Sequence, residues 1–120
     1  MGTVGGRDGY AFGISESLAV VGRSHNLGGT ERATLWLNGS PVDLGGIGGN
    51  LAVAYAINDS NQIVGTSQSE HIDSYATLWT EGRAFDLNLL VDQAASTAGW
   101  SLRDARAINN NGQIAGFAYN

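Results

Sequence analysis

Short apolar runs separated by polar turns follow one another along the whole chain, and the pattern returns at a fixed interval. The segment AFGISESLAVVGRS, which begins at Ala11, returns as AYAINDSNQIVGTS from Ala54. The segment ATLWLNGSPVDLG from Ala33 returns as ATLWTEGRAFDLN from Ala76, so both intervals are 43 residues. A third copy of the first segment begins at Ala105, 51 residues after Ala54. A repeat of roughly 20–50 residues is typical of stacked or radially arranged structural units.

The first half of each unit predicts a β-hairpin. In the second copy, residues 54–58 form a short apolar strand, a polar turn follows, and residues 63–68 form the return strand. In the third copy the turn contains Asn111-Gly112. We expect a primed turn at this pair, because Asn and Gly tolerate the positive φ that such a turn needs.

The second half of each unit predicts a second hairpin. The strand ATLW leads to Asn38-Gly39 in one copy and to Glu81-Gly82 in the other, and a short return strand follows each pair. Apolar residues fall on both faces of these strands, as is typical of sheets that are covered on both sides. Each unit therefore holds four strands, which is the content of one propeller blade.

These patterns predict an all-β chain of repeated four-stranded antiparallel units within a single domain, residues 1–120. Unit 1 spans about residues 7–49 and unit 2 about residues 50–88, an insertion occupies residues 89–101, and a half unit covers residues 102–120. Eight extra residues separate the second and third copies, and we expect a helical turn or an ordered loop there.

Closure of the repeat is the next expectation. Propellers contain roughly 4–8 blades, whereas this chain holds about two and a half units. An open ring would leave blade faces bare and strand edges unpaired. We therefore expect a β-propeller-like ring completed by homo-oligomerisation, with the chain itself as the main partner. Two alternatives are that the chain is part of a longer protein and that it folds as a compact three-lobed monomer resembling a trefoil or prism.

The motif A-x-A/G-I-N-x-x-x-Q-I/V-x-G, followed by A-T-L-W-x-x-G-x-x-x-D-L-G, resembles the HAF-repeat family of bacterial proteins, named for a His-Ala-Phe tripeptide. The resemblance covers nearly the whole chain. Residues 32–34 read Arg-Ala-Thr and residues 75–77 read Tyr-Ala-Thr, so no role of the family's His carries over. The resemblance implies a propeller-like, extracellular or surface-associated repeat protein. It supplies no catalytic residues to transfer, and we recognise no signal peptide in this chain.

Composition narrows the function classes. The chain has 42% hydrophobic and 14% charged residues, which indicates a folded protein rather than a disordered one. Its formal net charge is −5 and its six basic residues are all Arg, so we expect no nucleic-acid partner. It has no Cys, which excludes disulfides and Cys-ligated metals. We also expect no membrane span, no cofactor and no metal.

Several residues recur at equivalent repeat positions, and we interpret them as structural. The two Asp residues before Leu could act as general acids or calcium ligands, but their repetition favours carboxylates that cap turns. The turns at residues 58–61 and 109–111 are rich in side-chain oxygens, yet they lack the acidic spacing of an EF-hand loop. The structural repeat positions are Trp36, Trp79, Asp43, Asp86, Gly22, Gly65 and Gly116.

Residues that the repeat does not dictate are better candidates for ligand contacts. Trp100 follows the insertion, and a flat ring at such a place can stack on a sugar or insert at a partner surface. His25 and His71 occupy non-equivalent positions in the loops that join the two hairpins, and Asp73 lies near His71. We therefore predict ligand contacts from Trp100, His25, His71 and Asp73.

The leading functional hypothesis is a non-catalytic binding or interaction module. Its contacts would come from the loops at residues 23–31, 67–75 and 89–100, with carbohydrate or protein as the ligand. A purely structural self-assembling unit is the alternative. A glycan-acting enzyme or lectin-like sugar binder is a further one, and no catalytic residue is assigned.

Overall fold

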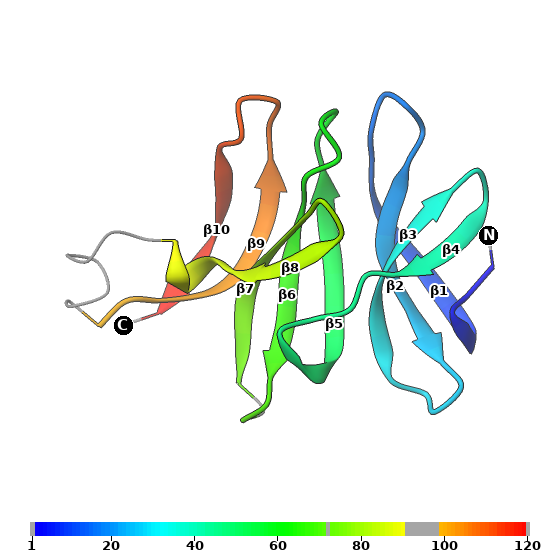
Figure 1. Cartoon of the computed structure of the whole chain (residues 1–120), viewed down its shortest axis with the longest axis horizontal. Helices are drawn as coiled ribbons and strands as arrows, with labels where there is room; N and C mark the ends of the chain where they lie inside the picture. The colour runs from blue at the N-terminus through cyan, green and yellow to red at the C-terminus, as the bar shows by residue number, and fades with distance from the viewer. Residues whose placement is uncertain (1, 72, 91–98, 120) are drawn as a thin grey trace.

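A computed structural model describes residues 2–71, 73–90 and 99–119. These residues form an all-β structure of two four-stranded antiparallel sheets and one two-stranded sheet (Figure 1). Sheet 1 contains β1 (Gly5–Ile14), β2 (Val20–Asn26), β3 (Glu31–Leu37) and β4 (Ser40–Asp43). Sheet 2 contains β5 (Gly48–Ile57), β6 (Ile63–Ser69), β7 (Ser74–Thr80) and β8 (Arg83–Asp86). The two-stranded sheet contains β9 (Ser101–Ile108) and β10 (Ile114–Tyr119).

Sheets 1 and 2 have the same strand order and the same register. Gly22 lies opposite Thr34 in sheet 1, and the equivalent Gly65 lies opposite Thr77 in sheet 2. The strands β9 and β10 pair as β5 and β6 do, so they form the first hairpin of a third unit. The predicted all-β chain of repeated four-stranded antiparallel sheets is confirmed.

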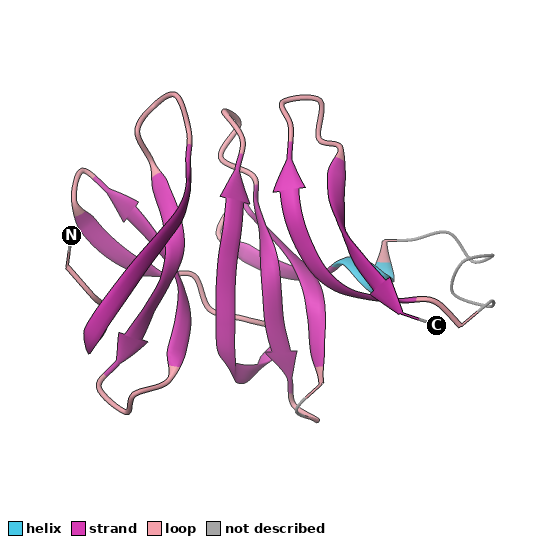
Figure 2. Ribbon diagram, turned by 180° about the vertical axis from the view of Figure 1, so that it is seen from behind, coloured by secondary structure: helices cyan, strands magenta, loops and turns pink. Residues whose placement is uncertain are grey.

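The three sheets lie side by side in an open row, as Figure 2 shows from behind. Strands β2 and β3 pack on β5, and β6 and β7 pack on β9. Contacts also join β1 to β5 and β5 to β9, so the first strands of the sheets are neighbours. The row measures 42 × 32 × 20 Å. Closure into a ring stays a prediction, as does the three-lobed alternative.

The core lies between the sheets. Val21 and Ala33 of sheet 1 pack with Ala54 and Trp79 of sheet 2, and all four are buried. All five residues of β6 from 63 to 67 are buried, which confirms that the middle sheet is covered on both faces. The outward face of sheet 1 differs: Ile14 is 61% exposed, whereas its counterpart Ile57 is 8% exposed.

A glycine at the third position of the second strand lets the first two strands of each unit approach closely. A Cβ on Gly22 would lie 1.9 Å from the carbonyl oxygen of Tyr10, and one on Gly65 would lie 2.0 Å from that of Val53. Gly116 has the same contact, at 1.9 Å from the carbonyl oxygen of Asp104. Only glycine fits a backbone approach of this kind.

The turns follow two designs, and one prediction was wrong. Asn38 and Gly39 have φ values of 51° and 83°, as a primed two-residue turn requires. At Asn111-Gly112 only Gly112 has positive φ, at 79°. The loop there is longer because the side-chain oxygen of Asn109 accepts hydrogen bonds from the backbone N–H groups of residues 111 and 113, both at 3.0 Å. This internal cap favours a wider loop over the two-residue turn.

A single 3₁₀ turn, η1 (Leu87–Leu89), ends unit 2 and leads into the insertion. Residues 91–98, on which most of the predicted helical turn or loop falls, lie outside the described residues. The side chain of Asn88 in η1 accepts a hydrogen bond from Leu102 N at 2.7 Å and donates one to Leu102 O at 2.9 Å. Asn88 thereby fixes the beginning of β9 against the end of sheet 2.

We predict that Gly65→Ala destabilises the fold by about 3 kcal/mol, because the added Cβ must displace the backbone of β5. Gly28→Ala is the matched control, since its Cβ would meet only the side-chain oxygen of Asn26, at 3.4 Å. Urea unfolding followed by circular dichroism measures both variants. Equal stability of the two variants would contradict the close-approach argument.

Candidate functional site

The first strands of the three units carry an aromatic or basic side chain at one equivalent position. These residues are Phe12 in β1, Tyr55 in β5 and Arg106 in β9. The ring centroids of Phe12 and Tyr55 are 5.6 Å apart, and the guanidinium of Arg106 lies 4.0 Å from the Tyr55 ring centroid. The three side chains therefore form a continuous stack across all three sheets.

Residues on the neighbouring strands extend this stack at both ends. Arg23 of β2 lies over the Tyr10 ring at 4.9 Å and over the Phe12 ring at 5.7 Å. Arg106 also lies 5.8 Å from the Phe117 ring centroid. Each cation–π contact at an exposed position contributes about 0.5–1 kcal/mol. We name this group the aromatic–arginine cluster: Tyr10, Phe12, Arg23, Tyr55, Arg106 and Phe117.

The cluster lies at the surface. Tyr10 is 46% exposed, Phe12 47% and Phe117 55%. Aromatic side chains that are open to solvent and continuous with one another mark interaction surfaces more often than scattered single apolar residues do. The stacked rings are also held in place by the guanidinium groups, so a ligand would meet a surface that is already ordered.

Each arginine of the cluster has an acidic partner. Arg23 Nη1 lies 2.9 Å from Glu31 Oε1, and Arg106 Nη2 lies 3.3 Å from Asp104 Oδ2. The opposite charges balance, so the cluster presents aromatic faces together with paired hydrogen-bond donors and acceptors. Within the described residues, the buried Arg23 Nε and His25 Nδ1 have no hydrogen-bond partner.

Tyr55 is the central member of the cluster. Its partial burial raises its pKa above the ordinary value for tyrosine, and the positive charge of Arg106 opposes that rise. The carboxylate of Asp104 adds to the increase. Like an ordinary tyrosine, Tyr55 is protonated at neutral pH, and its phenolic O–H can donate a hydrogen bond.

The ligand residues predicted from the sequence lie outside this cluster. Trp100 is 49% exposed just before β9, and it makes no ring or cation–π contact with the described residues. The prediction that His25 lies in a loop was wrong, because β2 extends to Asn26 and His25 pairs with Glu31 of β3. His71 lies in the exposed turn after β6, where its backbone N–H donates to Ser69 Oγ at 3.2 Å.

Asp73 makes a weak ion pair, with its carboxylate 3.9 Å from Arg103 Nη1 and its side chain 56% exposed. In the described part of the chain, no hydrogen bond or ion pair joins any two of Trp100, His25, His71 and Asp73. The same part contains no group of three or more His, Asp or Glu side chains that could hold a metal ion. These four residues stay predictions as ligand contacts.

The repeated Trp and Asp residues hold backbone segments in matching ways. Trp36 Nε1 donates to Gly2 O at 2.7 Å, and Trp79 Nε1 donates to Gly45 O at 3.2 Å. Asp43 Oδ1 accepts from the N–H of Gly45, and Asp86 Oδ1 accepts from the N–H of residue 88, both at 2.9 Å. Each carboxylate therefore satisfies the backbone at the exit from the fourth strand.

The polar turns of the three units hydrogen-bond to one another. Asp59 Oδ1 accepts from Glu16 N at 3.0 Å, and Asp59 N donates to Asn110 Oδ1 at 2.9 Å. Asn110 Nδ2 donates to Asp59 Oδ2 at 2.9 Å. We call residues 16, 59 and 110 the corner ladder. The hydrogen bonds from Glu16 N and Asn110 lower the pKa of Asp59, because they favour its ionised form.

Sequence reasoning missed the aromatic–arginine cluster because it looked for ligand contacts in loops. A signal was available: when the three copies are aligned, positions 12, 55 and 106 hold Phe, Tyr and Arg. Tyr and Arg are among the residues most enriched at the energetic centres of interfaces.

Comparison with known proteins assigns no relatives: no family model, no curated protein and no solved structure matches this chain. In the described residues, no helix has the length and apolar character needed to cross a membrane.

We predict that the stability of the Asp59→Asn variant depends less on pH in the acid range than the stability of the wild type does. The folded-state pKa of Asp59 is lowered, so its contribution is present above the ordinary carboxyl value and is lost as pH falls below about 4. The wild type should therefore melt at a higher temperature than the variant at pH 7, and the difference should shrink in acid. Thermal melts across this range measure it. Asp8→Asn, which removes a charge from an exposed position of β1, should not reproduce the effect.

Proposed function

We propose that this chain is a non-catalytic β-repeat binding module and that the aromatic–arginine cluster is its ligand surface. The observation that carries the proposal is the continuous stack of Phe12, Tyr55 and Arg106 across three units. The propeller-like architecture that the HAF-repeat resemblance implies is part of the same proposal. The matching sheets and the neighbouring first strands support it.

A neutral carbohydrate is the ligand class that best fits this chemistry. Sugars have apolar ring faces bordered by hydroxyl groups, so they need flat apolar surfaces next to hydrogen-bonding groups. Tyr10 and Phe12 supply exposed rings, while the Arg23–Glu31 pair supplies donors and acceptors without net charge. Most small-molecule sites likewise combine an apolar lining with a few placed polar groups.

A glycan-cleaving activity has less support. Glycoside hydrolysis uses a general acid with a raised pKa beside a second carboxylate. Here the Glu31 and Asp104 carboxylates are each engaged by an arginine. The pKa of Asp59 is shifted in the opposite direction, and its oxygens are occupied in the corner ladder. Binding without bond cleavage is therefore the proposed activity.

We predict that the chain binds a neutral oligosaccharide and that Tyr10→Ala and Phe12→Ala each weaken this binding about tenfold or more, because each removes a stacking surface. A glycan array identifies the sugar, and isothermal titration calorimetry measures the affinities. Trp100→Ala is the matched control, since it removes an equally exposed aromatic from outside the cluster. The proposal fails if no neutral glycan binds, or if Trp100→Ala loses binding while the cluster variants keep it.

A structural self-assembling unit is the second candidate, and the outward face of sheet 1 favours it. Ile14 is 61% exposed and Ala11 is exposed, whereas their counterparts Ile57 and Ala54 are buried between sheets. Apolar positions that the repeat buries elsewhere are thus open to solvent on this face. A second molecule stacked there would bury them.

We predict that the protein self-associates and that Ile14→Lys weakens association, because the substitution puts a charge on the outward face of sheet 1. Sedimentation velocity over a range of concentrations measures the change, and thermal stability should rise with concentration for the wild type alone. Leu27→Lys, at a 91% exposed loop position, serves as the control. A monomer at every concentration would rule this candidate out.

A further inference from the structure

Strand β10 is a sheet edge beside an apolar cavity. Within the described residues β10 pairs only with β9, whereas its counterparts β2 and β6 each pair with strands on both sides. A cavity of about 360 Å³ lies next to this edge. Its lining is mostly apolar and includes Ala76, Leu87, Leu90, Ala105 and Ile114.

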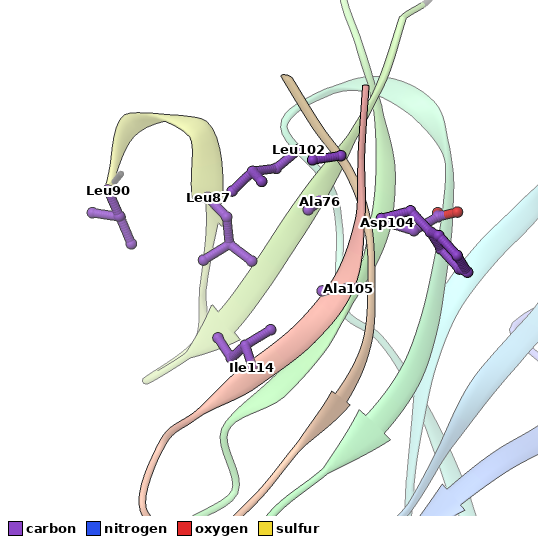
Figure 3. Close-up of a pocket in the computed structure, with 10 residues that line it drawn as sticks. Ala76, Leu87, Leu90, Leu102, Asp104, Ala105 and Ile114 are labelled. Carbon is purple, nitrogen blue, oxygen red and sulfur yellow. The ribbon is translucent and has the colours of Figure 1, made fainter. Parts of the chain in front are cut away.

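Figure 3 shows how the lining side chains are arranged. Leu87, Leu90 and Ile114 lie on one side of the β9–β10 hairpin, whereas Asp104 lies on the other side. The apolar side chains therefore face a shared space at the end of sheet 2. Leu90 and Ile114 are 62% and 38% exposed, so this space is open to solvent.

The same space exists one unit earlier, where it is filled. Between sheets 1 and 2, the positions equivalent to Ala76, Leu87 and Ala105 are Ala33, Leu44 and Ala54. All three belong to or pack against the same apolar cluster as the Trp79 side chain, which is 2% exposed. Among the described residues, the matching cluster between sheet 2 and β9 contains Ala76, Leu87 and Ala105 but no tryptophan.

We propose that the cavity beside β10 is the binding slot for an Ala-Thr-Leu-Trp β-hairpin like the chain's own segments at residues 33–44 and 76–87. The Trp side chain would enter the cavity, and the first strand of the hairpin would pair with β10. The interface is a continuation of the one already formed between sheets 1 and 2. Main-chain pairing at an open edge supplies affinity, and the pocket for alternate side chains supplies specificity.

The register of the bound strand follows from sheet 2. There Ile63 lies opposite Trp79, and Val64 lies opposite Leu78. In the slot, Ile114 therefore lies opposite the incoming Trp, and Ala115 lies opposite the incoming Leu. The strand runs antiparallel to β10, as β7 runs antiparallel to β6.

A labelled peptide with the sequence of residues 74–87 tests the proposal by fluorescence anisotropy with the whole chain. We expect saturable binding, and replacement of the peptide's Trp by Ala should weaken it about tenfold or more. Ile114→Arg should reduce binding to a similar extent, because a charged side chain would occupy the slot. The Leu27→Arg variant, which has the same added charge at an exposed loop of sheet 1, should bind the peptide with the affinity of the wild type.

Disulfide trapping tests the register, because the chain has no Cys of its own. Ala115→Cys should crosslink efficiently to a peptide with Cys in place of its Leu, and Cys placed three positions away in the peptide should crosslink poorly. An isolated hairpin is barely stable in water. In a second experiment, the peptide of residues 74–87 is therefore joined to the chain through a flexible Gly-Ser linker, and hydrogen exchange of the β10 amides is measured.

Slower exchange at β10 in the linked protein, lost on replacing the hairpin's Trp by Ala, supports the proposal. Unchanged exchange together with no peptide binding overturns it. Displacement of the peptide by the unlabelled chain itself would assign the edge to a second copy instead, and would also overturn it. Sugar binding at the aromatic–arginine cluster is measured with different residues, so failure of either proposal leaves the other intact.

Discussion

The close approach of two strands at a glycine is the constraint on which the rest of this structure depends. In sheet 2 the carbonyl oxygen of Val53 lies where a Cβ of residue 65 would be, and the register of β5 shifts between Ala54 and Ala56. A bulge of this kind changes the direction in which successive side chains point. Ala54 thereby packs toward sheet 1, while Tyr55 is stacked by Arg106 of β9. One glycine in each unit thus allows the first strand of a unit to contact the sheets on both of its sides.

Because every unit repeats this geometry, residues at equivalent positions meet across the sheets. The backbone of Glu16 binds the side chain of Asp59 at a separation of 43 residues, and Asp59 binds Asn110 at a separation of 51. The stack of Phe12, Tyr55 and Arg106 has the same origin. The eight extra residues before β9 leave these contacts unchanged, because Asn88 holds the start of β9 at Leu102.

The sequence was sufficient to predict the strands and their repetition, because each copy supports the others. It predicted the turn at Asn38-Gly39 correctly, since two adjacent residues there take positive φ. The sequence-based prediction failed at Asn111-Gly112, because the side chain of Asn109, two residues earlier, determines the loop conformation there through its hydrogen bond to Asn111 N. The candidate site depends on the spacing between sheets, which brings Arg106 over Tyr55. Local patterns contain no information on that spacing, so residues that were predicted to lie in loops, such as His25, were favoured instead.

The two ends of the row are chemically different, and this has a consequence for symmetry. One end is the outward face of a complete sheet that bears Ile14, and the other is an open hairpin with an apolar cavity beside it. Two copies joined through like ends can be related by a twofold axis, whereas a contact between the unlike ends is heterologous. Contacts of this heterologous kind have a direction. An assembly built on such contacts either closes as a cyclic oligomer with a whole number of copies or continues as a helical fibre.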